Sequence, residues 1–301
     1  MHTSTARINK NKKESGQALL IVLLGMAVIL TLVLSIVSRS VTDISLTKKD
    51  EESLRAFSAA EAGVEQLLVG GPSATSFPNS SYSGNITYIE GERYYNLINK
   101  YYSGEVGTVW FVSHDASGNL TCGGGANCVD PTNNTFKLCW GAMDTTPPAI
   151  EVSLYFDVFG LSFNGDFTNL MIARSTFDPD EARRTNDNFF GQGYTSDCTF
   201  ASGPTYRYTS NAKNFYTDLG LPVGCNEQCL LFAKIKILYN TVSDNIGVTL
   251  NNDTLPAQAI KVTSTGFSGE ATRKVEAVQT FAEPLSIFDN AVFSNAGNLS
   301  K

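Results

Sequence analysis

An uncharged apolar stretch near the start of the chain restricts its possible folds more than any other feature. Residues 17–38 read QALLIVLLGMAVILTLVLSIVS and contain no Asp, Glu, Lys or Arg. Fourteen of the twenty residues from Ala18 to Val37 are Leu, Ile or Val, which favours membrane insertion by roughly 4 to 8 kcal/mol. Twenty helical residues span about 30 Å, the thickness of the hydrocarbon core of a bilayer. We therefore expect a transmembrane helix at residues 18–38. A buried core helix, the alternative, would have to be apolar on every face.

The charges on either side of this stretch predict its orientation. Residues 1–16 carry four basic side chains and one acidic side chain, whereas the rest of the chain carries 18 basic and 28 acidic residues. The positive-inside rule then places residues 1–16 in the cytoplasm and the residues after Arg39 outside. The net charge of −7 argues against nucleic-acid binding, because phosphate neutralisation requires clustered Lys and Arg.

The helical pattern continues beyond the apolar stretch. Residues 39–69 contain no proline and no glycine before Gly63, and Gly70–Gly71–Pro72 provides a stop signal. The apolar residues at helical spacing are Val41, Ile44, Leu54, Phe57, Ala60, Val64, Leu67 and Leu68. The pattern predicts one helix over residues 17–69, whose second half, residues 39–69, is amphipathic and packs on another part of the chain. A cleavable signal peptide is the main alternative, but its apolar region usually has about 7–15 residues and is followed by a small-x-small site.

Three features of this segment resemble the N-terminal region of type IV pilin-like proteins. A short basic leader ends at Gly16, directly before the apolar helix, like a prepilin processing site. The continuation from Gln17 to Val22 (QALLIV) is similar to PilX-type minor pilins and pseudopilins. The sequence Ala59–Ala60–Glu61–Ala62–Gly63 resembles a signature at the end of their helix. The resemblance covers residues 12–69. It implies that a prepilin peptidase cuts between Gly16 and Gln17, and that the helix later packs against other pilin subunits in a filament.

Two positions depart from the pattern of major pilins. Gln17 stands where the mature chain usually begins with phenylalanine, and Ile21 stands where most members carry glutamate. In the family, that glutamate pairs with the terminal amine of a neighbouring subunit. An unpaired carboxylate within the membrane costs about 2.5–3.5 kcal/mol, so a chain without one is stable in lipid but lacks this ionic contact. The departures are similar to the pseudopilin at a filament tip and imply a minor subunit.

The remainder of the chain, residues 71–301, is predicted to be a β-rich head, giving an α+β fold. Apolar and polar residues alternate over 150–158 and over 232–239, where Lys234 and Lys236 are expected to face solvent. Residues 259–265 and 271–281 are expected to form a hairpin with a loop at 266–269. Residues 72–107 suggest loops with short strands, and residues 70–84 are the candidate linker. Trp110 and Trp140 are expected to anchor the core.

Six cysteines occur, all in the predicted head. They are Cys122, Cys128, Cys139, Cys198, Cys225 and Cys229. An even number in an extracytoplasmic segment predicts up to three disulfides, with fifteen possible pairings. Cys122 with Cys128 and Cys225 with Cys229 are close enough in sequence to close small rings. A zinc site is the alternative, but the sequence contains no CxxC pair and only two histidines.

No motif in the head predicts catalysis or a cofactor. Ser113–His114–Asp115 contains the residue types of a catalytic triad, but neighbours on a strand point to opposite faces, and we expect an exposed His114 in a turn. Asp178–Pro179–Asp180–Glu181, followed by Arg183, Arg184, Asn186 and Asp187, lacks the spacing of a calcium loop. We expect a solvated loop with internal ion pairs there.

The sequence therefore predicts three segments: a cytoplasmic leader (1–16), a pilin-like helix segment (17–70) and an extracytoplasmic head (71–301). The predicted function is that of a minor pilin or pseudopilin, a structural subunit of a type IV pilus or related filament with a role in assembly or adhesion. Its predicted partners are the membrane, the prepilin peptidase and other pilin subunits, and no cofactor or enzymatic activity is expected. The alternative is an unprocessed single-pass surface protein with a binding or enzymatic head.

Overall fold

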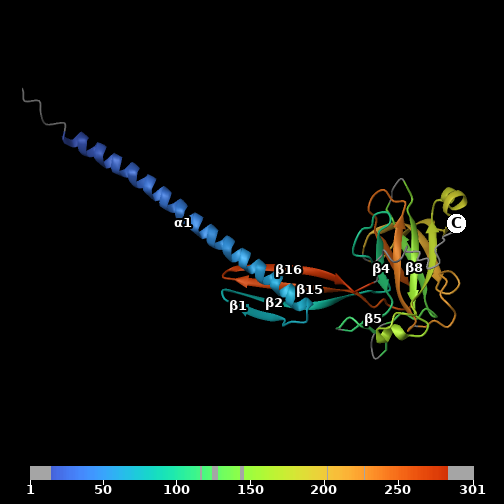
Figure 1. Cartoon of the computed structure of the whole chain (residues 1–301). Helices are drawn as coiled ribbons and strands as arrows, with labels where there is room; N and C mark the ends of the chain where they lie inside the picture. The colour runs from blue at the N-terminus through green and yellow to red at the C-terminus, as the bar shows by residue number, and fades with distance from the viewer. Residues whose placement is uncertain are drawn as a thin grey trace, which may run out of the picture. The chain divides into compact units, whose positions relative to one another are not determined.

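The structure is a computed structural model of the chain. This structure describes residues 15–115, 117–123, 128–142, 146–201, 203–226 and 228–283, with side chains from Ala18 onward. The helices are α1 (Ser15–Leu68), η1 (Leu161–Asn164), α2 (Glu181–Arg183) and the π-helical turn η2 (Arg184–Asn188). The strands are β1 (Ala74–Phe77), β2 (Ser80–Glu90), β3 (Tyr94–Asn96), β4 (Val106–Trp110), β5 (Ser113–His114), β6 (Leu120–Thr121), β7 (Thr135–Trp140), β8 (Ala149–Phe156), β9 (Met171–Asp178), β10 (Gly191–Gln192), β11 (Tyr194–Thr199), β12 (Thr205–Asn214), β13 (Leu230–Leu238), β14 (Ile246–Leu250), β15 (Ala257–Ser268) and β16 (Ala271–Thr280). The predicted α+β fold, a long apolar N-terminal helix followed by a β-rich part, is confirmed (Figure 1).

The chain forms two compact units. The first contains residues up to Asn85 together with 262–277, and the second contains residues 86–261 together with the chain from Val278. The first unit therefore extends past residue 70 and includes a segment from near the C-terminus. The strands β2, β15 and β16 each contribute residues to both units.

The first unit consists of α1 and part of a four-stranded sheet with the order β1–β2–β15–β16. Its hydrophobic cluster contains Val64 and Leu67 of the helix and Val262 of β15. The segment interpreted as a linker, residues 70–84, instead contains β1 and the start of β2, which pair antiparallel from Ala74 opposite Ser83 to Phe77 opposite Ser80. The linker prediction was wrong because these strands are mostly polar and lack an alternating pattern.

The second unit is a β-sandwich of two five-stranded sheets. Their strand orders are β10–β9–β8–β13–β4 and β11–β12–β7–β14–β3. One hydrophobic core takes side chains from both sheets, including Leu138 and Trp140 of β7 and Val152 and Ile235 of β8 and β13. Both tryptophans are buried, as expected: Trp140 in this core and Trp110 in a smaller cluster.

The strand predictions at 150–158 and 232–239 coincide with β8 and β13, but the expected exposure of two lysines was wrong. Lys234 is 3% exposed and Lys236 is 9% exposed. Strand β13 lies between β8 and β4 in its sheet, and all but its last residue is buried. The ammonium group of Lys234 lies 5.7 Å from the centre of the Tyr155 ring, a cation–π arrangement.

The predicted hairpin formed by residues 259–265 and 271–281 is present as β15 and β16, but its loop is shorter than expected. Strand β15 continues through Gly266 to Ser268, and β16 begins at Ala271. Gly266 is therefore a strand residue. A Cβ atom placed on it would lie 2.6 Å from the backbone nitrogen of Ala60, so this glycine lets the strand approach the helix rather than make a turn.

Candidate functional site

The first half of α1 exposes its apolar side chains. The fourteen Leu, Ile and Val residues from Leu19 to Val37 have exposed fractions between 51% and 68%. Fully burying one such side chain stabilises a structure by about 1.5–3 kcal/mol, so this surface requires an apolar partner. Helix α1 is long and apolar enough to span a membrane.

The predicted processing site lies at the beginning of this helix. Helix α1 starts at Ser15, so the backbone of Gly16 and Gln17 belongs to its first turn. Residues 1–14 of the predicted leader lie outside the described residues. Ile21, the position at which most relatives in the resembled family carry glutamate, is 68% exposed on the apolar half.

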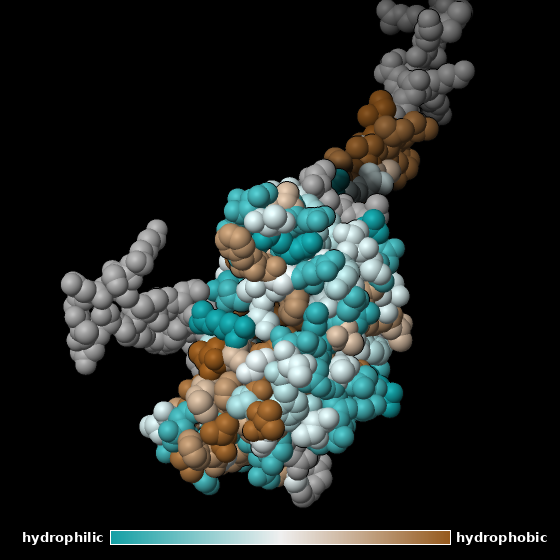
Figure 2. Space-filling model, turned by 90° about the vertical axis from the view of Figure 1, so that its right-hand side faces the viewer, coloured by the Kyte–Doolittle hydropathy of each residue, from teal (hydrophilic) through white to brown (hydrophobic). Residues whose placement is uncertain are grey.

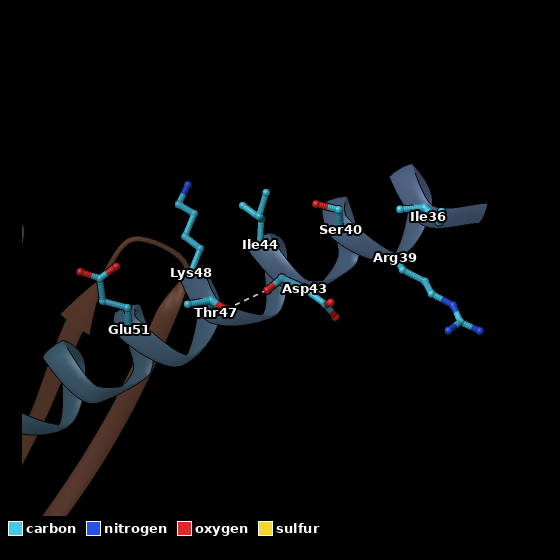
Figure 3. Close-up of a pocket in the computed structure, with 8 residues that line it drawn as sticks. All are labelled: Ile36, Arg39, Ser40, Asp43, Ile44, Thr47, Lys48 and Glu51. Carbon is cyan, nitrogen blue, oxygen red and sulfur yellow. Dashed lines mark hydrogen bonds between the residues drawn. The ribbon is translucent and has the colours of Figure 1, made fainter. Parts of the chain in front are cut away.

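The middle of α1 has a mixed polar and apolar face that is separate from the sheet (Figure 3). The eight residues on it come from one side of one helix: Ile36, Arg39, Ser40, Asp43, Ile44, Thr47, Lys48 and Glu51. The hydroxyl of Thr47 donates a hydrogen bond of 2.8 Å to the carbonyl oxygen of Asp43. Charges of both signs therefore follow the apolar half along α1.

The end of α1 packs on the sheet through small side chains. The buried helix residues are Ala56, Ala59, Ala60, Gly63, Val64 and Leu67, which follow the i, i+3, i+4, i+7 pattern of one helical face. This set contains three residues of the signature at 59–63, whereas Glu61 of that signature is exposed and Ala62 is half-buried.

The packing face differs from the one expected from the large apolar residues. Ala60, Val64 and Leu67 are buried as expected, but the other members of the predicted face are exposed by 38–68%: Val41, Ile44, Leu54, Phe57 and Leu68. At about 100° per residue, Leu54, Phe57 and Leu68 lie 100° or more around the helix from Ala56. The prediction was wrong there because the helix approaches the sheet closely, and close approach selects small residues over large apolar ones.

Polar contacts support this packing at the β15–β16 turn. The backbone nitrogen of Glu270 donates to a carboxylate oxygen of Glu52 over 3.3 Å. The guanidinium of Arg273 donates to the hydroxyl of Ser53 over 2.7 and 2.9 Å. Both contacts involve helix residues just before Ala56, the first of the small buried residues. They connect the helix to the β15–β16 hairpin and so fix its position along its axis.

The expected disulfides are present, and all lie in the second unit. Cys122 pairs with Cys128, Cys139 with Cys198, and Cys225 with Cys229. The first and third close the two small rings, and the second joins β7 to β11, which flank β12 in their sheet. Since all six cysteines are bonded, none remains to ligate zinc.

The triad residue types at 113–115 do not form a relay. The carboxylate of Asp115 accepts hydrogen bonds from the backbone and side chain of Asn119 and from the backbone of Ser117, which lowers its pKa. His114 was expected to be exposed, but its ring stacks on Phe281 at 3.8 Å and meets the edge of Trp110 at 4.4 Å. This burial lowers the pKa of His114 to about 4. The expectation was wrong because the ring contacts come from residues distant in sequence.

The acidic loop after β9 is internally paired, as expected, but it is not fully solvated. Asp178 is completely buried and accepts hydrogen bonds from Arg183 at 2.7 and 2.9 Å and from Asn188 at 2.8 Å. Burial opposes ionisation of Asp178, but these donors outweigh it and lower its pKa. The guanidinium of Arg183 also lies 4.7 Å from the centre of the Tyr239 ring. In the described part of the chain, no group of three or more His, Cys, Asp or Glu side chains could hold a metal ion.

These features define an α+β protein with one helix suited to membrane anchoring and a disulfide-bonded β-sandwich. Comparisons with family models, with curated proteins and with solved structures found no match to this chain.

Proposed function

We propose that the protein is a minor pilin or pseudopilin, a structural subunit of a type IV pilus or a related filament. The observation that carries the proposal is the division of α1 into two parts. Its first half exposes every large apolar side chain, and its last quarter is packed on a sheet through small residues. Such a helix can move from lipid into a bundle of like helices while the rest of the subunit stays folded.

The exposed half of α1 supports two successive environments. In a bilayer, its apolar side chains face lipid, and its length matches the hydrocarbon core. In a filament, the same side chains pack against the helices of neighbouring subunits, which again removes them from water. The mixed face from Ile36 to Glu51 carries both signs of charge, and it provides polar contacts to a neighbour at the point where the apolar half ends.

The processing step rests on the residues around Gly16. A prepilin peptidase would cut between Gly16 and Gln17 on the cytoplasmic side and remove the basic leader. The absence of a carboxylate at Ile21 supports a minor subunit, because the chain would need no amine of an earlier subunit to neutralise a charge in the membrane. A position at the filament tip is consistent with that feature.

The disulfides support an extracytoplasmic location for the β-sandwich. Disulfides form and persist in oxidising compartments and are rare in the cytosol. A cytoplasmic N-terminus with the sandwich outside agrees with the basic leader. We propose a structural and adhesive role for the sandwich rather than a catalytic one.

Photo-crosslinking in cells that assemble such filaments tests the proposal. p-Benzoylphenylalanine is introduced at Ile36 or Ile44, which are 68% and 67% exposed on α1, or at Phe189, an 80% exposed control in the second unit. We expect both helix positions to crosslink to other pilin subunits only in cells with an active prepilin peptidase, and the control position to give no such product. Helix crosslinks that do not depend on the peptidase, or no subunit crosslinks in assembling cells, would indicate a permanently anchored surface protein instead.

A further inference from the structure

The second unit contains a cavity that the proposed function does not use. It has a volume of about 460 Å³, which lies in the usual range for small-molecule sites. Its apolar lining consists of Trp110, Leu120, Phe163, Phe167, Leu170 and Phe232. Four of these six side chains are aromatic, and all of the lining residues of the cavity belong to one unit.

The floor of the cavity is a row of rings on the outer side of a sheet. Phe232 of β13 is paired with Trp110 of β4 on one side and Tyr155 of β8 on the other. The ring centre of Phe232 lies 4.7 Å from the ring centre of Trp110 and 4.4 Å from that of Tyr155. Ile172 of β9 continues the row opposite Tyr155. Strands β4 and β13 therefore hold the two rings that line the cavity, Trp110 and Phe232, and Tyr155 and Ile172 extend the row beyond it.

The wall formed by the β8–β9 connection is fixed in place by hydrogen bonds. A carboxylate oxygen of Asp157 accepts bonds of 2.8 Å from both the backbone nitrogen and the hydroxyl of Ser162. Its other oxygen accepts from the backbone nitrogen of Phe159 over 2.9 Å. Because Asp157 is fully buried, these bonds hold η1 in place, which lowers the ordering cost of presenting Phe163 to a ligand.

Apolar side chains around this wall are exposed to an unusual degree. Figure 2 shows brown, hydrophobic residues gathered on the lower part of the globular portion of the molecule. The exposed large apolar residues of the β8–β9 connection and the start of β9 are Val158, Phe159, Phe167, Met171 and Ile172, with exposed fractions from 38% to 68%. Exposed apolar side chains beside a cavity are typical of a binding site.

The rim of the cavity is acidic. Glu283 lines it and is exposed, and its carboxylate accepts a hydrogen bond from the hydroxyl of Thr108. Exposed Asp115 and Asp166 do not line the cavity but adjoin the lining residues His114, Gly165 and Phe167 in sequence. Hydrogen bonds from Asn119 and Thr168, respectively, lower the pKa values of Asp115 and Asp166, so both are ionised at neutral pH. The lining contains no Lys or Arg.

One polar atom at the cavity lacks a partner. The Nδ1 atom of His114 is buried and has no hydrogen-bond partner within the described ranges. A buried polar atom without a partner costs about 1–3 kcal/mol, so this side chain adds a local energetic cost beside the cavity. His114 lines this cavity with Trp110.

We propose that this cavity binds a small organic cation with an aromatic body, such as an aryl-alkylammonium ion. The aromatic body would lie against Trp110, Phe163 and Phe232, and the ammonium group would lie at the acidic rim near Glu283. The site is independent of the filament function, since none of its lining residues lies on α1.

The test uses the full chain in phosphatidylcholine nanodiscs, with its two tryptophan indoles labelled with ¹⁵N. The probes are 2-phenylethylammonium and its anionic counterpart 3-phenylpropionate. We expect 2-phenylethylammonium to shift the Trp110 indole signal saturably, with at least about tenfold weaker binding of the anion because of the acidic rim. Trp140 is the internal reference, since its indole nitrogen donates to Pro148 within the core.

Two variants and two matched controls identify the site. Phe167→Ala, at a residue 52% exposed, should weaken binding of the cation by about five- to tenfold through loss of ring contact. Glu283→Gln should reduce the preference for the cation over the anion by about threefold or more. Phe189→Ala and Asp187→Asn, at exposed positions outside the cavity, should change neither value.

The outcomes that overturn the proposal are distinct from these. They are the absence of a saturable shift at Trp110, equal binding of cation and anion, equal shifts at both tryptophans, or equal effects of the Phe167 and Phe189 variants. An unchanged Trp140 signal in each variant shows that the sandwich is still folded, so loss of binding in that variant is assigned to the cavity.

Discussion

Gly63 of α1 lies against the ring of Tyr82 on β2 so closely that a Cβ atom on the glycine would be 2.6 Å from Cδ2 of the ring. Tyr82 is 2% exposed, and its hydroxyl donates a 3.0 Å hydrogen bond to the carbonyl oxygen of Pro72. The ring is therefore buried and held at its hydroxyl end. This contact explains why a glycine occupies the middle of a helical face.

The first prediction concerns this contact. Gly63→Leu should destabilise the packing of α1 on the sheet by about 1–3 kcal/mol, because the added side chain overfills the interface. Hydrogen exchange of the amides at 56–68, measured by mass spectrometry, should become faster. Gly25→Leu is the matched control, since nothing lies within 4 Å of a Cβ at Gly25, and it should leave this exchange unchanged. Equal exchange in the two variants would contradict the close packing.

The second prediction concerns the disulfides. Cys139 and Cys198 are separated by 59 positions in sequence, whereas Cys225 and Cys229 are separated by four. In the chain-entropy model, the longer loop stabilises the fold by about 4 kcal/mol and the shorter one by about 2 kcal/mol. Urea unfolding followed by tryptophan fluorescence should show a larger loss for Cys139→Ser/Cys198→Ser than for Cys225→Ser/Cys229→Ser. The reverse order would refute the entropic ranking.

The third prediction concerns protonation of His114. Its ring is buried against Trp110 and Phe281, and its pKa is lowered to about 4. In the unfolded chain the histidine has its ordinary pKa of about 6.5, so the unfolded state takes up the proton first. The stability of the second unit therefore falls as pH decreases from 6.5 towards 4. NMR titration of histidine-labelled protein should give one resonance with a midpoint near pH 4. His114→Gln identifies that resonance, and a midpoint near 6.5 for His114 would show that its ring is solvated.

The fourth prediction concerns Asp178. Replacing it with alanine removes the closer of two carboxylates beside the partly buried Arg183 and leaves Asp180 at 3.5 Å, and this should cost about 3 kcal/mol. The folded-state pKa of Asp178 is lowered, so its contribution is present above its unfolded pKa of about 3.9 and is lost as pH falls below that value. Denaturant unfolding at pH 7 measures the difference. Asp187→Asn, at an exposed position of the same loop, is the control and should change stability by less than about 0.5 kcal/mol.

The features that could be predicted from the sequence are those with strong local patterns. The apolar run at 17–38, the alternation in β8 and β13, and the glycine-containing hairpin signal of β15 and β16 each identify an element without reference to the rest of the chain. The even cysteine count in a predicted exported segment likewise indicated disulfides. Patterns of this kind depend only on neighbouring residues, and this is why the fold class was correct.

The features that were missed depend on contacts between distant segments. The first two strands, β1 and β2, are polar, and they form a sheet edge beside β15 only because the chain returns there 167 residues after the end of β2. Lys234 alternates with apolar residues as an exposed lysine would, but its strand is central. The cavity joins Trp110, Phe163 and Glu283 from separate parts of the sequence, and no local signal marks it. The unpaired His114 could have been noticed only as the single histidine of the head.

The mass of the mature N-terminus tests the central proposal most directly. The full chain is isolated from membranes of cells with and without an active prepilin peptidase, and its N-terminal peptide is sequenced by mass spectrometry. The account predicts a chain that begins at Gln17 when the peptidase is active, and retention of the leader in a Gly16→Leu variant. A chain that still begins at Met1 in the presence of the active peptidase would contradict the assignment as a pilin-like subunit.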